Sequence, residues 1–376
     1  MTLHPKIVAD QDIPYLKGIL EPFAHVEYFK GSKIQRKHLL DAEVLIIRTR
    51  TICDKNLLDG TNIKLICSAT IGMDHIDKNY CDQQGIQYNN APGCNSGSVM
   101  QYVVSALVSL SIKYNFDLSK KTIGIIGYGN VGSKVAALAS ALGMKVLVND
   151  PPLQRSGFDF DFVSLEKIQK EADILSFHVP LNREGIDNTF HMVCSKFFKS
   201  LSPQCFIINS SRGEVMDNKA LKEALLNKQI KGAVLDVWEN EPDIDIELLQ
   251  SVDFGTAHIA GYSVEGKANG TASCIRTISK YFKIDLPEYY PQNLPEPQGS
   301  DIYIDNTIYA DVEIIKNLIL NSYNILSDHV CLLQEPVNFE ELRSNYKPRR
   351  EFNFYHPILK FENKNLEYII HSLGFQ

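Results

Sequence analysis

Residues 121–150 read KTIGIIGYGNVGSKVAALASALGMKVLVND and contain a complete strand–turn–helix–strand unit. The run from Thr122 to Ile126 is short, apolar and β-branched, which is typical of a buried parallel strand. Three glycines in the spacing GxGxxG follow it, and a stretch with helical periodicity comes next. A second apolar run, residues 145–148, leads directly to Asp150. This stretch predicts an open parallel α/β sheet that holds a ligand at its first turn.

Each glycine of this turn has a separate physical use. Gly127 permits the tight turn, Gly129 lets backbone N–H groups approach a pyrophosphate, and Gly132 lets the helix pack closely on the strand. The helix N-terminus offers unpaired donors to phosphates. Asp150 can accept both ribose hydroxyls and would repel a 2′-phosphate, which favours NAD over NADP. An ordinary glycine turn is the alternative, but strand, helix, second strand and acid all stand at the required offsets.

Composition narrows the remaining function classes. The 376 residues are too many for one core of usual size and indicate two or three domains. A net charge of −7 gives no basic field for nucleic acid or anionic membranes. The eight cysteines form no CxxC pair, which favours reduced thiols, a cytoplasmic location and no metal site. The N-terminus MTLHPKIVAD lacks a signal-peptide pattern, and no 18-residue apolar span is present.

The chain alternates strand-like and helix-like stretches before and after the glycine turn. Residues 1–95 hold five candidate strands but no glycine-rich loop, and therefore predict a small parallel α/β domain suited to hold a substrate. The candidate strands are residues 6–9, 26–29, 44–47, 65–67 and 86–88. After a long helix over 95–115, the glycine-turn domain continues with strands at 174–178, 206–209 and 232–236 and a helix at 218–227. Six strands of this kind suit the doubly wound order.

The last part of the chain reads differently. Residues 284–300 are proline-rich, as in a linker. Beyond them we expect one amphipathic helix over Asp311–Ser327 and, in LRSNYKPRREF, a basic cluster. For Arg349 and Arg350 we expect a solvated basic face rather than a reach into a partner's site. The segment is small and apolar on one helix face, which predicts packing against another subunit.

Three polar stretches follow strand ends on the expected ligand side of the sheet. They are NSSRGE around Arg212, DVWENEP around Glu241, and AHIAGY around His258. Oxidation of a 2-hydroxy acid needs a base for the hydroxyl proton, a carboxylate to orient that base and a guanidinium for the substrate carboxylate. His258, Glu241 and Arg212 fit these roles in that order. Taken singly, each has another explanation: a structural histidine, a solvated turn residue and a surface ion pair.

The motifs VLDVWENEP, INSSRGEVMD and AHIAG resemble the signatures of D-isomer-specific 2-hydroxyacid dehydrogenases. The resemblance implies that Arg212, Glu241 and His258 are catalytic, with His258 as the acid–base. It also implies a Rossmann NAD-binding domain (96–257) inserted in a flavodoxin-like substrate domain (1–95 and 258–283), with the active site in the cleft between them. Residues 284–376 would form a small α+β dimerisation domain, and the protein a homodimer.

Four further stretches resemble one branch of that family, the 4-phosphoerythronate dehydrogenases of vitamin B6 biosynthesis. They are IRTRT (47–51), SATIGMDHID (68–77), NNAPGCNSGSV (89–99) and HIAGYSVEGKANGT (258–271). The resemblance implies substrate contacts from Thr49, Thr70 and Tyr262. Arg48 and Arg50 end a strand beside Thr49 and are candidate phosphate ligands, with exposed solubilising charge as an equal alternative. The expected NAD-binding residues are Gly127, Gly129, Asn130, Val131, Gly132, Asp150, Val179, Ser210, Ser211, Arg212, Asp236 and Gly261. Val179 lacks a hydroxyl, and would contribute backbone alone.

The expected activity is NAD-dependent oxidation of 4-phospho-D-erythronate at C2. Phosphoglycerate dehydrogenase or another 2-hydroxyacid dehydrogenase is an alternative, since it would share the three catalytic side chains. The Tyr262 segment and the lack of a regulatory βαββαβ tail argue against phosphoglycerate. A non-catalytic NAD(H)-sensing protein on the same fold is a third possibility, against which the intact Arg212, Glu241 and His258 argue.

Overall fold

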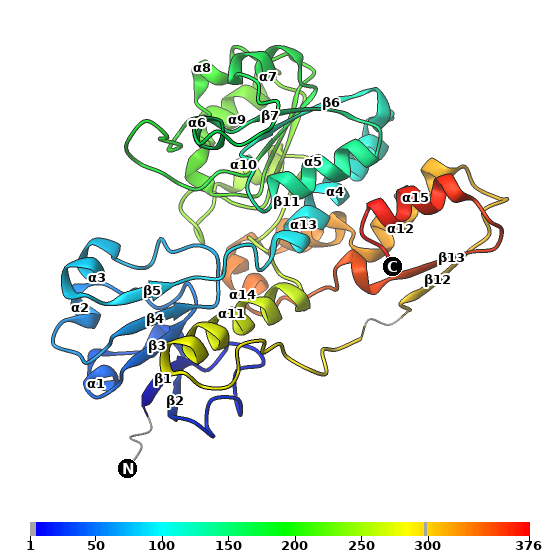
Figure 1. Cartoon of the computed structure of the whole chain (residues 1–376). Coiled ribbons are helices and arrows are strands. Elements are labelled where there is room, and N and C mark those ends of the chain that lie inside the picture. The colour runs from blue at the N-terminus through cyan, green and yellow to red at the C-terminus, as the bar shows by residue number, and fades with distance from the viewer. Residues whose placement is uncertain (1–4, 297–298) are drawn as a thin grey trace. The chain divides into compact units, whose positions relative to one another are not determined.

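The computed structural model describes residues 5–296 and 299–376 (Figure 1). Residues 1–4 of the N-terminal stretch and 297–298 of the proline-rich stretch lie outside the described residues. The chain forms two compact units. Unit 1 comprises Met1–Asn95 and Ser263–Pro295, and unit 2 comprises Ser96–Tyr262 and Glu296–Gln376. The C-terminal segment thus groups with the glycine-turn unit, and the division of the chain into three domains stays a prediction.

Unit 1 contains a five-stranded parallel sheet in the order β2-β1-β3-β4-β5. Its strands are β1 (Lys6–Asp10), β2 (His25–Phe29), β3 (Val44–Ile47), β4 (Leu65–Ser68) and β5 (Gln87–Asn89). The helices of this unit are α1 (Arg36–Leu39), α2 (Lys55–Leu58), α3 (Lys78–Gln84) and α11 (Val264–Phe282), of which α11 packs on β4. The strand order reverses between β1 and β3, which is the flavodoxin-like pattern and confirms the expected fold class of this part.

Unit 2 contains a six-stranded parallel sheet in the order β11-β10-β9-β8-β6-β7. Its strands are β6 (Thr122–Ile126), β7 (Lys145–Asn149), β8 (Ile174–Phe177), β9 (Phe206–Asn209), β10 (Gly232–Leu235) and β11 (Phe254–Gly255). Beyond β7 a single parallel bridge joins Val148 to Phe162. With that bridge counted as the third strand, the order is the doubly wound one of dinucleotide-binding sheets, as expected.

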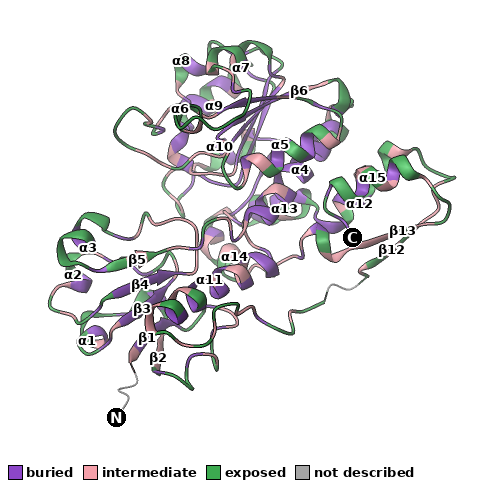
Figure 2. Ribbon diagram, in the orientation of Figure 1, coloured by how far each residue is buried: buried purple, intermediate pink, exposed green. Residues whose placement is uncertain are grey.

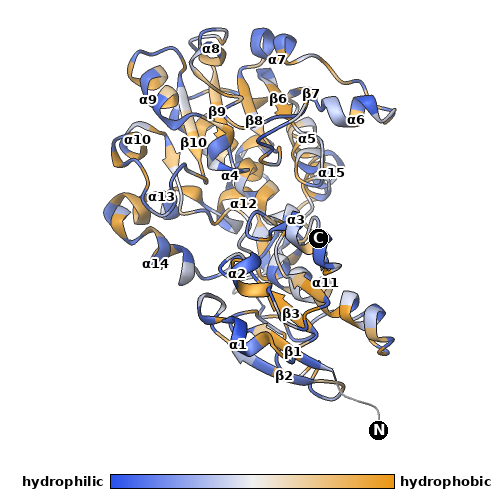
Figure 3. Cartoon of the chain, turned by 90° about the vertical axis from the view of Figure 1, so that its left-hand side faces the viewer, coloured by the Kyte–Doolittle hydropathy of each residue, from blue (hydrophilic) through white to orange (hydrophobic). Residues whose placement is uncertain are grey.

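The strands of this sheet are buried on both faces. Those at its centre are the most hydrophobic part of the unit, whereas the surrounding helices carry both hydrophobic and hydrophilic residues (Figure 3). The covering helices include α5 (Gly132–Ala141), α7 (Leu165–Glu171), α8 (Ser195–Phe198), α9 (Asn218–Leu226) and α10 (Ile246–Ser251). Such near-continuous apolar strands are what a parallel sheet covered on both sides requires.

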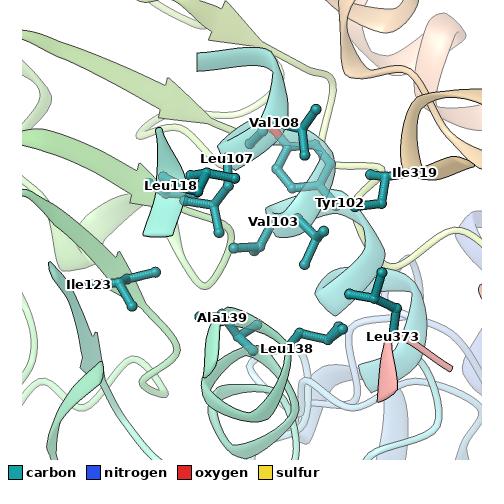
Figure 4. Close-up of a cluster of buried hydrophobic side chains, with 14 of the residues drawn as sticks. Tyr102, Val103, Leu107, Val108, Leu118, Ile123, Leu138, Ala139, Ile319 and Leu373 are labelled. Carbon is teal, nitrogen blue, oxygen red and sulfur yellow. The ribbon is translucent and has the colours of Figure 1, made fainter. Parts of the chain in front are cut away.

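Helix α4 (Ser96–Lys113) forms the centre of the largest core of unit 2. Residues on several of its sides, among them Tyr102, Val103 and Leu107, are fully buried. They lie against Leu138 of α5 and Ile319 of α12 (Figure 4). A helix that is buried on most of its sides lies inside a protein, and α4 packs against both the C-terminal segment and the elements of the six-stranded sheet.

The C-terminal segment contains α12 (Asp311–Ser322), α13 (Ile325–Gln334), α14 (Phe339–Ser344), α15 (Lys364–Ser372) and the parallel pair β12 (Asp301–Ile304) and β13 (His356–Leu359). The prediction of one helix over Asp311–Ser327 was wrong. The helix ends before Tyr323, which is extended, and Asn324 caps the next helix by accepting from Leu326 N–H. Asparagine at this position favours a new helix start.

The prediction of a solvated basic face at Arg349 and Arg350 was also wrong. Arg350 is 4% exposed, and the Arg349 guanidinium donates to backbone carbonyls inside unit 2. The sequence shows that the two residues are charged, but it does not show which acceptors the fold places around them. An arginine whose guanidinium has hydrogen-bond acceptors can be buried, whereas one without acceptors stays exposed.

The eight cysteines are all free thiols. Within residues 5–296 and 299–376, no helix is long and apolar enough to span a membrane. The same residues contain no group of three or more His, Cys, Asp or Glu side chains arranged for a metal ion. The cytoplasmic location inferred from the cysteines stays a prediction.

Candidate active site at the carboxyl ends of the unit 2 sheet

The glycine turn after β6 has the geometry that its spacing predicts. Gly127 has φ +92°. A Cβ there would lie 2.6 Å from the His178 carbonyl oxygen, which only glycine avoids. At Gly129 a Cβ would meet no protein atom within 4 Å. The space in front of Gly129 is therefore open to a ligand, as the pyrophosphate hypothesis requires.

Asp150 follows β7 directly and lies beside this turn. Its carboxylate accepts from the Tyr128 N–H at 2.7 Å and from the Leu153 N–H at 2.9 Å. It thereby caps α6 (Pro151–Arg155) and ties the glycine turn to the end of the neighbouring strand. The Tyr128 ring also lies tilted against the Phe160 ring, with centroids 4.3 Å apart. Partly exposed aromatic rings thus lie on the residues next to this turn.

Strand pairing brings the other predicted residues to this same edge. Asn209, the last residue of β9, pairs with Leu235 of β10, and Leu235 pairs with Gly255 of β11. Beyond the strands, Asp236 N–H donates to the Asn209 carbonyl at 3.0 Å, and His258 N–H donates to the Asp236 carbonyl at 2.8 Å. The stretches that carry Arg212, Glu241 and His258 therefore begin side by side, although they are far apart in sequence.

His258 and Glu241 form a hydrogen-bonded pair. His258 Nδ1 lies 2.7 Å from Glu241 Oε2, with side-chain exposures of 28% and 19%. The other carboxylate oxygen accepts from Trp238 N–H at 2.9 Å. Burial raises the pKa of Glu241, but the charge and hydrogen bond of His258 and the Trp238 N–H outweigh it, and the pKa lies below its usual value. A carboxylate bound to Nδ1 fixes the tautomer and leaves Nε2 for a reacting hydroxyl.

His258 has a backbone conformation that is rare for a histidine. Its φ is +54° in the left-handed region, which costs energy and persists where the surroundings enforce it. Asp236 helps to stabilise this conformation, because its carboxylate accepts hydrogen bonds from Ile259 N–H at 2.8 Å and Ala260 N–H at 2.9 Å. Asp236 is only 1% exposed. Its visible role is to hold the histidine loop, and direct contact with a cofactor stays a prediction.

Arg212 follows β9 in a turn organised by Asn209. The Asn209 side chain donates to the Arg212 carbonyl at 2.9 Å and accepts from the Ser211 N–H and hydroxyl. Arg212 Nη1 donates to the Ser211 carbonyl at 2.8 Å, which orients the guanidinium. The buried Ser210 hydroxyl has no hydrogen-bond partner in the protein. An orphaned buried donor at this edge is what a site for a polar cofactor would leave.

The substrate residues implied by the family resemblance lie in both units and are described separately. In unit 1, Thr49 is exposed just after β3, and the Thr70 hydroxyl lies 2.8 Å from that of Ser68 after β4. Arg48 Nε donates to Asp10 at 3.0 Å. In unit 2, Val179, Gly261 and Tyr262 are half-buried. Their proposed contacts are not tested by these positions.

Lys267, in the first turn of α11 in unit 1, is a further candidate that was not predicted from the sequence. Burial, followed by the charge of Arg48, lowers the pKa of Lys267 to about 8. One signal was available: a cation is disfavoured in the first turn of a helix, so a lysine there suggests an anionic partner.

The chain matches the family model of the D-isomer specific 2-hydroxyacid dehydrogenase NAD-binding domain over residues 107–260. Similar curated proteins are erythronate-4-phosphate dehydrogenases. That of Bacteroides thetaiotaomicron is 45% identical over 94% of this chain and 99% of its own. That of Escherichia coli O1:K1 is 38% identical over 98% of both chains.

Solved structures of the wider family share the fold. The D-lactate dehydrogenase of Aquifex aeolicus, complexed with NAD and lactic acid, superposes with a TM-score of 0.63 at 26% identity and covers 75% of this chain and 96% of its own. The NAD⁺-bound 3-phosphoglycerate dehydrogenase of Entamoeba histolytica has a TM-score of 0.65 at 24% identity and covers 78% and 100%. The chain belongs to the D-isomer specific 2-hydroxyacid dehydrogenases and, within them, to the erythronate-4-phosphate dehydrogenases.

Proposed function

We propose that this protein oxidises 4-phospho-D-erythronate at C2 with NAD and yields 2-oxo-3-hydroxy-4-phosphobutanoate. The observation that carries the chemistry is the 2.7 Å pair of His258 Nδ1 and Glu241 at the carboxyl edge of the sheet. The substrate follows from relatives of 38–45% identity over nearly the whole chain that bear the name erythronate-4-phosphate dehydrogenase.

Each of the three catalytic side chains has a separate role in the reaction. His258 Nε2 accepts the C2 hydroxyl proton, and Glu241 stabilises the imidazolium that forms. Arg212 binds the substrate carboxylate through its guanidinium and polarises the developing carbonyl. NAD, when bound, supplies the nicotinamide ring that takes the hydride from C2. Proton and hydride together account for the two hydrogens that the alcohol loses.

The residues at the sheet edge fit NAD. The open space before Gly129 admits a pyrophosphate, and the unpaired Ser210 hydroxyl offers a buried hydrogen bond. Asp150 is a carboxylate beside the turn, where a 2′-phosphate would meet its negative charge. Asn130, Val131 and Gly132 complete the turn, and Val179 and Gly261 contribute backbone. We infer that Asp150 selects NAD over NADP.

A phosphorylated substrate needs a cationic subsite, and unit 1 offers two cations. Arg48 is held by Asp10 and, through Nη2, by Asp12 at 3.3 Å. Lys267 loses part of its proton affinity to burial and to Arg48, which a bound phosphate dianion would restore. We assign the phosphate to Lys267 and Arg48, with Thr49, Thr70 and Tyr262 as further substrate contacts.

We also infer a homodimer formed through the C-terminal segment. Six large apolar side chains there are 52–78% exposed: Tyr303, Ile308, Tyr309, Val312, Phe361 and Tyr368. Exposed residues alternate with buried and intermediate ones along α12 and α15 (Figure 2). Such a concentration of exposed apolar side chains marks an association surface, and a second copy of the chain offers the same surface in return.

A substrate panel tests the proposed activity. Purified protein is given NAD with 4-phospho-D-erythronate, 3-phosphoglycerate, glycerate or lactate, and NADH absorbance is followed. We expect the highest kcat/KM with 4-phospho-D-erythronate. A preference for 3-phosphoglycerate would replace the substrate but keep the mechanism, and tight NADH binding without turnover of any acid would favour a sensing role.

A further inference from the structure

Arg349 lies in the C-terminal segment of unit 2, enclosed by acceptors from distant parts of that unit. Nη2 donates to the carbonyl oxygens of Ala260 at 2.6 Å and Ser98 at 2.9 Å. Nε donates to the Gln101 side-chain oxygen at 2.9 Å, and Nη1 donates to the Ile259 carbonyl at 3.3 Å. The rigid fork of arginine can serve several acceptors in this way, and lysine cannot.

The charge of Arg349 is compensated inside the same cluster. Its guanidinium lies over the Tyr323 ring, 4.0 Å from the centroid. Asp328 accepts from the hydroxyls of Tyr323 at 2.8 Å and Tyr346 at 3.1 Å. Burial favours the neutral form of Arg349, but Tyr346, Tyr323 and Asp328 together raise its pKa above the usual value. Arg349 is therefore a buried residue that keeps its positive charge in the folded protein.

Two of the carbonyls that Arg349 binds belong to the two residues after His258. The N–H groups of Ile259 and Ala260 donate to Asp236, and their carbonyl oxygens accept from Arg349. The segment is therefore held through its N–H groups by the sheet edge and through its carbonyls by the C-terminal segment. These hydrogen bonds on both sides of the segment explain how His258 keeps its positive φ angle.

The same cluster also contacts Tyr262, the proposed substrate residue. Arg349 Nη1 lies 3.5 Å from the Tyr262 carbonyl oxygen. The rings of Tyr262 and Tyr346 meet edge to face with centroids 6.1 Å apart. Both ends of the segment from Ile259 to Tyr262, which directly follows His258, are thus contacted by residues of the C-terminal segment.

We propose that Arg349 is a positioning residue for the dehydrogenase reaction, which sets the placement of His258 and Tyr262 through their backbone. The inference rests on the proposed function for the reaction itself and adds a role for the C-terminal segment beyond association. It predicts that loss of the Arg349 fork slows the chemical step more than it weakens cofactor binding, because Arg349 holds the histidine loop.

The test compares Arg349→Met and Arg349→Lys with the wild type as purified holoenzyme. We expect kcat to fall about 10²-fold in Arg349→Met, the usual effect of a displaced catalytic group, with the Kd for NADH within about twofold. The deuterium isotope effect on kcat, measured with substrate labelled at C2, should rise because hydride transfer becomes limiting. Arg349→Lys should recover only part of kcat, since an ammonium cannot serve all the carbonyls.

Ile370→Ala is the matched control, because Ile370 is a buried residue of α15 in the same segment. Its thermal stability should fall, while kcat and the isotope effect stay at wild-type values. If Arg349→Met does not fold, the kcat and the isotope effect of Arg349→Lys test the positioning role instead. Wild-type kcat and isotope effect in a folded Arg349 variant would overturn the positioning role. An inactive wild type would instead contradict the proposed function, so the two failures are distinguishable.

Discussion

The position of His258 is fixed by one short hydrogen bond of its side chain and by one strained backbone angle. Glu241 accepts at 2.7 Å from Nδ1, and the pKa of Glu241 lies below its usual value despite burial. A carboxyl with a lowered folded pKa stabilises the protein above its unfolded pKa and loses that contribution as pH falls through the folded pKa. Glu241 is therefore ionised at neutral pH, and its contribution to stability is lost only in acid.

Glu241→Gln tests that pair. Glutamine keeps the size of the side chain but cannot stabilise the imidazolium and can favour the wrong tautomer. We expect kcat to fall about 10³- to 10⁴-fold, as for other carboxylate-to-amide changes at such histidines, with the Kd for NADH unchanged. Steady-state kinetics and a fluorescence titration with NADH measure both quantities. A loss below tenfold would remove Glu241 from the mechanism.

Lys267 predicts an alkaline limit to substrate binding. Its pKa of about 8 means that it is cationic below that pH and loses its charge as pH rises through it. The KM for 4-phospho-D-erythronate should therefore rise between about pH 7 and about pH 9.5. Lys267→Arg should remove this rise, because arginine stays charged.

Lys280 supplies the control, since it is exposed on the same helix. Lys280→Gln should keep the wild-type pH profile. A wild-type KM that is independent of pH over this range would contradict the phosphate assignment of Lys267.

At the scale of one element, the turn after β6 contains one glycine that the fold requires, Gly127, and one that we expect only the ligand to require, Gly129. A Cβ at Gly127 would strike the His178 carbonyl, whereas a Cβ at Gly129 would meet open space. We expect Gly129→Ala to leave the Tm unchanged and to raise the Kd for NADH at least about tenfold. Gly127→Ala should lower the Tm as well, because φ there is +92°. Unchanged NADH affinity in Gly129→Ala would place the pyrophosphate elsewhere.

Elements whose patterns are local could be predicted from the sequence. The strands β6 to β10 and the helix α4 lie within a few residues of the expected ranges, because apolar runs and glycine turns are local signals. The single helix expected over Asp311–Ser327 failed because the chain breaks at Tyr323, whose ring is buried and whose carbonyl accepts from the Ser105 hydroxyl of α4 at 2.9 Å. A tertiary contact determines where the helix ends at this position, and hydrophobic periodicity cannot predict such a contact.

At the scale of the whole molecule, function depends on segments that are distant in sequence. The doubly wound order, which the sequence indicated, places the stretches that carry Arg212, Glu241 and His258 at one edge of the sheet, where His258 and Glu241 form a hydrogen bond. Arg349 could not be predicted in the same way. Its acceptors, the carbonyls of Ala260 and Ser98, are backbone atoms that any sequence would supply. Only the fold shows that they converge on one guanidinium.

The exposed apolar side chains of the C-terminal segment predict the assembly state. Val312→Asp, on α12, should convert the dimer to a monomer in light-scattering measurements, because it places a charge in an apolar interface. Ile186→Asp is the control, since Ile186 is 86% exposed outside that segment. A wild type that is monomeric at micromolar concentration would contradict the dimer.

The central claim is that His258 carries out proton transfer and does not bind the cofactor. The most direct measurement is turnover of 4-phospho-D-erythronate with NAD by His258→Ala, alongside a titration of the same variant with NADH. We predict that kcat falls about 10³-fold, within the usual range for loss of a general base, while the Kd for NADH stays within about twofold of the wild type. Near-normal turnover with lost NADH affinity would contradict the account.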